Sequence, residues 1–170
     1  MTAPTDRFWL LITMASALAV VIGLDACTVK DPSMDTARLT RLASDYAAAW
    51  SGQDPQALAS FYAENGRLQV NAGEPSVGRA AIAATAGAFM AAFPDMVVAL
   101  ESVSRESGRV VFRWRWTGTN TGPGGTGNAV DLRGYELWTL NENGLITESL
   151  GHYDEAEYER QMRDEASPSN

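Results

Sequence analysis

The sequence predicts an α+β domain in which three helices cover one face of a curved antiparallel sheet. Before Pro94, apolar residues recur at spacings of three and four, which is typical of helices. After Pro94 they alternate with polar residues, as in strands, and the connections between these strands are short. The predicted order is α-α-β-α-β-β-β-β. A curved sheet closed by helices forms a cone with an apolar interior, which suits a small-molecule pocket.

The first two helices follow from their caps and their apolar faces. Ser33 is available as the N-cap of the first helix, and Ser51-Gly52 ends it. Its apolar face carries Leu39, Leu42, Tyr46 and Trp50. Asp54 and Pro55 then supply an N-cap and a first-turn proline for a second, short helix. This helix is expected to run through Leu58, Phe61 and Tyr62.

The remaining elements are separated by glycine-rich or polar connections. Residues 64–66 predict a turn, residues 67–71 a short strand and residues 73–78 a loop. An alanine-rich helix over residues 79–93 stops at Pro94. Four strands follow at residues 96–103, 109–117, 130–140 and 145–153. The glycine-rich loop 118–128 is expected to be a mobile lip over the cone mouth, and the charged tail after residue 157 to fray.

The composition argues against several classes of partner. The chain of 170 residues has 13 basic and 21 acidic residues and a net charge of −8, and such a surface repels phosphate backbones. Nucleic acid is therefore not an expected partner. With one His, one Cys and no tight carboxylate cluster, neither a transition-metal site nor a cofactor is expected.

The N-terminal segment predicts export. Residues 8–24 carry no charge, and the run is slightly long for a signal peptide and slightly short for a spanning helix. The following Leu24-Asp25-Ala26-Cys27 resembles the bacterial lipobox, although Asp25 departs from it. A lipoprotein anchored through Cys27, an uncleaved membrane anchor and simple secretion all place the domain outside the cytoplasmic membrane. The expected division is an anchor or signal peptide over 1–27, a linker over 28–33, the folded domain over 34–162 and a flexible tail over 163–170.

Glu136 stands in the apolar face of a predicted strand. If residues 130–140 are extended, alternation places it with Val130, Leu132, Gly134, Trp138 and Leu140. A buried carboxylate costs several kcal/mol unless it is paired or protonated. It therefore predicts a general acid or a hydrogen-bond donor to a ligand carbonyl. The alternatives are an ion pair with Arg113 or Arg115, or exposure created by a bulge.

An aromatic stripe lies on the preceding strand. Phe112, Trp114 and Trp116 alternate with Arg113 and Arg115, so the rings share one face. Such a stripe is either plain core or the lining of the cone, and a lining of this kind would favour a flat apolar or aromatic ligand. The opposite face, with Arg113 and Arg115, is expected to be open surface unless another protein surface covers it.

Several segments in order resemble the SnoaL-like polyketide cyclase family within the nuclear transport factor two-like superfamily. They are YAAAWSGQDPQALASFYAENG, VGRAAI, AFPDM, RWTGTNTGPGG and GYELWTLNENGLITES, followed by HYD and Gln161-Met162. The resemblance covers residues 39–162 and implies a cone-shaped domain like that of ketosteroid isomerase. Because dimers are frequent in this superfamily, it also implies that the arginine face of the sheet could be the contact of a homodimer. The fold hosts enzymes and non-enzymes alike, so it does not identify a reaction.

Site residues transfer from the family one at a time. The isomerase tyrosine corresponds to Tyr46 and its neutral carboxylic acid to Glu136. Its base falls on Val70, beside Asn71, and neither can abstract a proton. The cyclase histidine is replaced by Asn120, and the cyclase aspartate corresponds to Asp131 or Glu136.

Two functions remain. The first is an exported, membrane-anchored module that binds a small, mostly apolar or aromatic molecule. The second is an acid/base enzyme of cyclase, isomerase or hydrolase type, with Glu136, Asp131 and Tyr46 as catalytic candidates. The missing base and histidine favour binding. The expected ligand contacts are Trp50, Val70, Asn71, Phe89, Phe112, Trp114, Trp116, Asn120 and Trp138.

Overall fold

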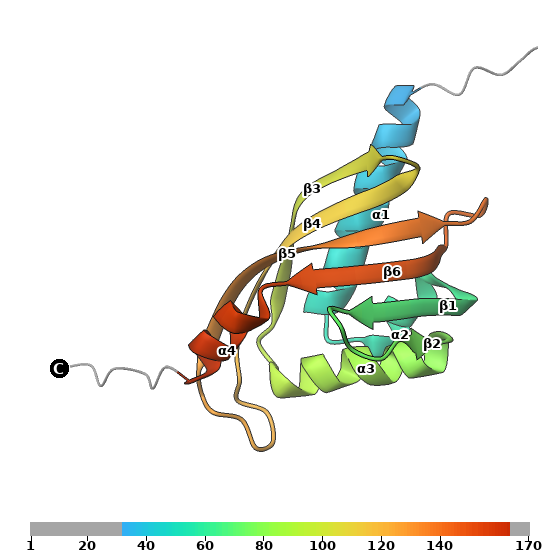
Figure 1. Ribbon diagram of the computed structural model, residues 1–170. Helices are drawn as coiled ribbons and strands as arrows, with labels where there is room; N and C mark the ends of the chain where they lie inside the picture. The colour runs from blue at the N-terminus through green and yellow to red at the C-terminus, as the bar shows by residue number, and fades with distance from the viewer. Residues whose placement is uncertain (1–31, 164–170) are drawn as a thin grey trace, which may run out of the picture.

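The computed structural model describes residues 32–163, which form a curved sheet with helices packed against it (Figure 1). The helices are α1 (Pro32–Ser51), α2 (Pro55–Ser60), α3 (Arg79–Ala92) and α4 (Glu155–Arg163). The strands are β1 (Tyr62–Val70), β2 (Ser76–Val77), β3 (Val97–Glu106), β4 (Arg109–Thr119), β5 (Ala129–Leu140) and β6 (Ile146–Tyr153). The expected signal segment, Cys27 and most of the linker lie outside the described residues, as do residues 164–170.

The sheet has the strand order β2-β1-β6-β5-β4-β3. The predicted antiparallel meander is confirmed, because β3, β4, β5 and β6 pair antiparallel with one another in sequence. The meander alone does not give the whole sheet. β1 joins it parallel to β6, next to the strand farthest from it in sequence, and so connects the two halves of the chain.

The expected turn at residues 64–66 is wrong. These residues belong to β1, and the pairing register with β6 shifts between Tyr62 and Arg67. Gly66 permits this bulge, since a Cβ there would lie 2.8 Å from the carbonyl oxygen of Ile146. The second helix also ends earlier than expected, at Ser60, because Tyr62 begins the strand.

The helices pack as their apolar faces predict. In α1 the buried residues are Leu39, Ala43, Tyr46, Ala47 and Trp50, and this helix lies against β3. Asp54 caps α2, because its Oδ1 accepts from the backbone N–H of Gln56 at 3.0 Å and of Ala57 at 2.9 Å. α2 in turn packs on α3, and both lie at the end of the sheet formed by β1 and β2 (Figure 1).

The expected fraying is wrong for residues 158–163, because they belong to α4 (Glu155–Arg163). The side chain of Gln161 accepts from the backbone N–H of Asp131 at 2.7 Å and donates to its carbonyl oxygen at 3.1 Å. Tyr158 stacks on Trp116 with ring centroids 6.1 Å apart. These contacts give the helix a docking site on β5 that charge patterning alone does not reveal.

The loop after β4, expected to be a mobile lip, is anchored by Asn120. The Asn120 side chain donates to the carbonyl oxygen of Ala92, the last residue of α3, at 3.1 Å. It also accepts from the backbone N–H of Thr126 at 2.8 Å. Gly122 donates from its backbone to the same Ala92 oxygen at 3.2 Å. The loop therefore closes the C-terminal end of α3.

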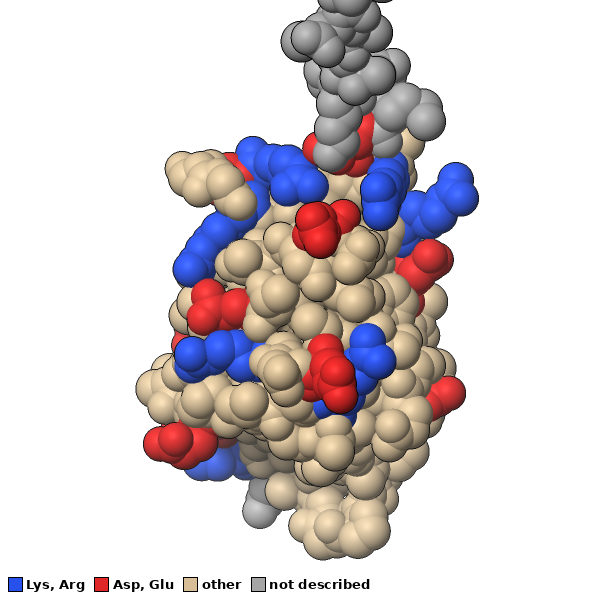
Figure 2. Space-filling model, turned by 90° about the vertical axis from the view of Figure 1, so that its right-hand side faces the viewer, with Lys and Arg blue, Asp and Glu red and all other residues tan. Residues whose placement is uncertain are grey.

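The described surface mixes both signs of charge. Figure 2 shows acidic and basic side chains interspersed on one face of the molecule. The outer side of the sheet carries pairs such as Arg133 with Glu101 at 2.8 Å and Arg109 with Glu148 at 3.1 Å. Within residues 32–163, no helix combines the length and the hydropathy needed to cross a membrane.

Replacing Gly122 with alanine is expected to loosen the loop from α3. The new Cβ would lie 1.9 Å from the carbonyl oxygen of Ala91, so the backbone must move. We expect Gly122→Ala to lower the free energy of unfolding by about 1–3 kcal/mol in urea denaturation. Gly87→Ala is the matched control, because its Cβ would meet only Pro55 at 3.4 Å and should leave stability unchanged or higher. Equal stability of the two variants would contradict the close contact.

Candidate functional site

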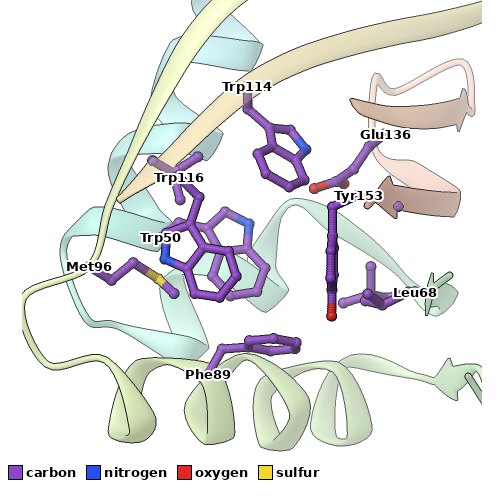
Figure 3. Close-up of a pocket in the computed structure, with 11 residues that line it drawn as sticks. Trp50, Leu68, Phe89, Met96, Trp114, Trp116, Glu136 and Tyr153 are labelled. Atoms are coloured by element: carbon purple, nitrogen blue, oxygen red, sulfur yellow. The ribbon is translucent and has the colours of Figure 1, made fainter. Parts of the chain in front are cut away.

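A cavity of about 60 Å³ lies inside the cone. Its walls are mostly apolar and come from both helices and strands (Figure 3). The lining residues are Trp50, Leu68, Val70, Phe89, Met96, Val98, Trp114, Trp116, Glu136, Gly151 and Tyr153. Among the predicted ligand contacts, the structure brings together Trp50, Val70, Phe89, Trp114 and Trp116.

Glu136 is buried in the wall of this cavity, with 6% of its surface exposed. Its Oε2 accepts three hydrogen bonds, from the side chains of Tyr46 at 3.0 Å, Trp138 at 2.7 Å and Ser149 at 2.6 Å. Among residues 32–163, no arginine pairs with it. Arg113 lies 3.8 Å from Glu106, and Arg115 donates to Asp131 at 2.7 Å, both on the outer side of the sheet. The ion-pair alternative for Glu136 is therefore excluded.

The two carboxyl oxygens of Glu136 have different surroundings. Oε2 is fully engaged, whereas Oε1 accepts no hydrogen bond from residues 32–163. Desolvation by burial raises the pKa of Glu136, although its three donors act in the opposite direction. The Trp138 indole N–H can only donate, so a proton on the neutral acid is better placed on Oε1. The neutral acid then carries its O–H on the oxygen that accepts no hydrogen bond from the described residues.

Tyr46 supports Glu136 from behind and does not line the cavity. Its side chain is fully buried, and its hydroxyl also lies 2.8 Å from that of Tyr62. Burial, and then the nearby Glu136 charge, raise the pKa of Tyr46, so its hydroxyl stays protonated and remains a donor. Tyr46 therefore orients the carboxyl group but does not touch a ligand.

Two glycines leave space for side chains around Glu136. Gly134 pairs with Trp114, and a Cβ there would lie 2.4 Å from the Trp114 ring. Gly151 pairs with Glu136 from β6, and a Cβ there would lie 3.6 Å from the Glu136 Cγ. The first glycine makes room for an indole, and the second leaves open space beside the carboxyl group.

Asp131 is not part of this site, which corrects the sequence prediction. Its side chain is 49% exposed and is held by Arg115. That hydrogen bond lowers the pKa of Asp131. The physical reason is alternation. Val130 and Leu132 face inward, so the residue between them must face the opposite side of the sheet.

Four further predicted ligand contacts do not line the cavity either. Asn120 anchors the loop described above. Phe112 stacks on Trp138 at 4.8 Å, and Trp138 donates to Glu136 from outside the cavity. Asn71 uses its Oδ1 to accept from the backbone N–H of Tyr153 at 3.0 Å. These residues shape the site without contacting its interior.

Sequence reasoning missed several residues on β6 and β1. Ser149, Gly151 and Tyr153 alternate on the inward face of β6, as period two requires. A serine and a glycine in the predicted inward face of residues 145–153 were the available signal. Tyr62 was missed because it was assigned to a helix, although it belongs to β1 and reaches Tyr46.

The described residues hold no metal-type cluster. Within residues 32–163, no three His, Cys, Asp or Glu side chains converge. His152 lies beside Tyr135 with ring centroids 5.0 Å apart. Tyr135 faces away from the cavity, since it sits between the inward-facing Gly134 and Glu136.

Comparison with known proteins agrees with this architecture. The sequence matches the SnoaL-like domain model over residues 43–149, more than half of the chain. No curated protein matches this sequence.

Solved structures share the fold at low sequence identity. A protein with a ketosteroid isomerase-like fold from Catenulispora acidiphila, in complex with trimethylamine, is 21% identical with a TM-score of 0.64, covering 76% of this chain and 97% of its own. A candidate SnoaL-like polyketide cyclase from Jannaschia sp. CCS1 is 20% identical with a TM-score of 0.68, covering 82% and 99%. AclR, a candidate hydroxylase from Streptomyces galilaeus, is 21% identical with a TM-score of 0.62, covering 75% and 96%. The predicted nuclear transport factor two-like fold is confirmed.

Glu136→Gln should remove a pH-dependent loss of stability. Because burial raises the folded-state pKa of Glu136, the folded protein binds this proton more tightly than the unfolded chain does. The free energy of unfolding of the wild type therefore falls as pH rises from the unfolded-state pKa, about 4.3, to the higher folded-state pKa. Glutamine can present a carbonyl oxygen to the same three donors and does not titrate.

We expect the stability advantage of Glu136→Gln over wild type to grow with pH across this interval, by at most about 1.4 kcal/mol per pH unit, and then to level off. Urea denaturation at a series of pH values measures it. Other titrating groups cancel in the difference between the two proteins. A difference that stays constant with pH would show that the pKa is not raised.

Proposed function

We propose that the chain, which belongs to the SnoaL-like domain family, binds a small, mostly apolar molecule in the cone cavity, with Glu136 as its polar contact. The proposal rests on the different surroundings of the two oxygens of the Glu136 carboxyl group. Oε2 is held by three protein donors, whereas Oε1, beside an aromatic cavity, has no hydrogen-bond partner in the described part of the chain. Such a group is fixed in place and still has a binding position to offer.

The cavity limits the size of the ligand. Its volume of about 60 Å³ is less than half of the roughly 150 Å³ that accommodates benzene in an engineered apolar cavity. Either the ligand is very small or only one end of it enters. The Catenulispora protein, whose complex contains trimethylamine, supports the view that this fold accommodates molecules of that size.

Binding fits the cavity better than catalysis does. Acid/base catalysis with a paired acid and base requires two groups within reach of one ligand atom. The Tyr46 hydroxyl lies within hydrogen-bond distance of Glu136, but Tyr46 does not line the cavity and so cannot reach a ligand atom. Tyr153 lines the cavity, yet Figure 3 shows its hydroxyl at the end of the ring away from Glu136. Within residues 32–163, Glu136 is thus the single carboxyl group in the lining.

The second candidate is an enzyme in which Glu136 acts alone as a general acid. The free Oε1 and the raised pKa favour it, since both place a proton next to the cavity. In that case the co-purified molecule would be chemically converted during incubation with wild type but not with Glu136→Gln. In a binding module, both proteins would release it unchanged.

Native mass spectrometry of the full chain tests the binding proposal. We expect a co-purified small molecule, and we expect Gly151→Ala to reduce its retention at least tenfold. The added methyl would fill the space beside Glu136 at ordinary contact distance, 3.6 Å, so this variant should fold. Gly87→Ala is the control, because its Cβ would meet Pro55 and Gly87 does not line the cavity, so it should retain the molecule. Equal retention by all three proteins would place the ligand elsewhere.

We also propose that the domain is exported and held at the membrane through its N-terminal segment. The uncharged run over residues 8–24 and the lipobox-like sequence before Cys27 support this. The mass of the membrane-extracted protein should match a chain that begins at a diacylglyceryl-modified Cys27. Recovery of intact residues 1–26 would contradict lipidation there. Cys27→Ser is the control, and it should lose the lipid mass.

A further inference from the structure

Aromatic rings stand around the cavity like the walls of a box. Five of the described lining residues are aromatic, namely Trp50, Phe89, Trp114, Trp116 and Tyr153. The plane of the Phe89 ring makes an angle of 83° with that of Trp50 and of 86° with that of Trp116. The rings of Trp116 and Tyr153 are at 73° to each other. Figure 3 shows the Phe89 ring as the floor of this aromatic box and the Tyr153 ring as a side wall.

The charge of the lining has one sign. Among residues 32–163, the lining contains one carboxyl group, on Glu136, and no Lys, Arg or His side chain. The face of an aromatic ring is electron-rich and carries the negative part of its quadrupole. Ring faces and carboxyl group therefore act in the same direction, and the aromatic box favours an occupant with positive charge.

Glu136 adds a hydrogen-bond acceptor that is not used by the described residues. Its Oε2 accepts from Tyr46, Trp138 and Ser149, whereas its Oε1 accepts from none of them. The indole N–H of Trp114 lies on the ring edge that faces Glu136, yet it has no hydrogen-bond partner among residues 32–163 (Figure 3). A buried acceptor without a donor is unfavourable. A ligand that donates one hydrogen bond would satisfy Oε1.

We propose that the cavity takes a small organic ammonium ion, whose N–H donates to Oε1 of ionised Glu136 and whose apolar substituents contact the ring faces. The proposal rests on the proposed function and names the chemical class of its ligand. It accounts for both features of the lining, the unused acceptor and the surrounding aromatic rings.

The carboxylate and the rings together offset the cost of taking a cation out of water. An N–H donor that carries charge makes a stronger hydrogen bond to a carboxylate than a neutral donor does. Ring faces attract a cation most when water is excluded from the contact. Burial raises the pKa of Glu136, and a cation beside the carboxyl group opposes that rise, so the ion stabilises the charged form. A neutral molecule of the same shape gains none of these terms.

Two probes of the same shape test this proposal on the full chain, after removal of any co-purified molecule. N,N-dimethylethanolamine is protonated at pH 7, as alkylamines are. 3-Methylbutan-1-ol differs from this ion only in having C–H in place of N⁺–H. We expect the ammonium ion to bind at least about tenfold more tightly in isothermal titration calorimetry. Its N-methyl proton signals should also move upfield on binding, because the methyl groups lie over ring faces.

Glu136→Gln removes the negative charge of the lining and should abolish the preference for the ammonium ion. Asp131→Asn is the matched control, because it removes the same charge from the same strand, at a side chain that is 49% exposed on the outer face of the sheet. This control should keep the preference. If Glu136→Gln does not fold, the two probes and the N-methyl shift on the wild type still decide the matter.

The outcomes separate this proposal from the proposed function. Equal or tighter binding of 3-methylbutan-1-ol, or binding of the ion without an upfield shift, overturns the ammonium proposal and leaves a binding cavity. A preference that persists in Glu136→Gln or disappears in Asp131→Asn overturns it as well, since the charge of Glu136 would then not be its source. Binding of neither probe counts against the proposed function itself, and the ammonium proposal falls with it.

Discussion

The burial of one carboxyl group constrains most of this fold. Removing Glu136 from water is unfavourable unless its oxygens find donors. The three donors to Oε2 come from α1, β5 and β6, and Tyr62 of β1 extends the network through Tyr46. The position of α1 relative to the sheet is therefore set by a polar contact as well as by apolar packing. A small displacement of α1 would leave a buried hydroxyl and a buried carboxyl group unpaired.

The same network distinguishes the residues that hold the Glu136 carboxyl group from the oxygen that is available to a ligand. Tyr46, Trp138 and Ser149 hold Oε2 from outside the cavity, so the carboxyl group cannot rotate to present both oxygens to a ligand. Oε1 is left beside the indoles of the cavity wall. A fixed group with one unused position suits recognition of a single polar atom on an otherwise apolar molecule. Because the other polar groups of the network lie outside the cavity, the part of the site that the structure describes offers no second group beside Glu136 for proton transfer to a ligand.

The two faces of the sheet differ in role. Inward-facing residues of β4 and β5 line or support the cavity, whereas Arg113, Arg115 and Asp131 on the outer face pair with one another or with neighbours in solvent. Exposed pairs of this kind contribute little to stability. Alternation along β4 places both arginines on the face opposite Glu136, which has no cationic partner among residues 32–163.

Local patterns determined much of what could be predicted. Alternation alone placed Glu136, Trp114 and Trp116 inward, and helical spacing placed Tyr46 and Trp50 on the buried side of α1. The same rule, applied to Asp131, would have put that residue outside. What only the tertiary structure decided was which groups meet: Tyr46 reaches Glu136 across 90 positions and Ser149 across 13. It also decided that β1 runs parallel to β6, that Asn120 anchors a loop, and that α4 docks on β5. Periodicity reports the face a side chain occupies, because that depends on backbone geometry over a few residues. The partner opposite that face depends on how distant segments of the chain pack, and no short-range pattern encodes it.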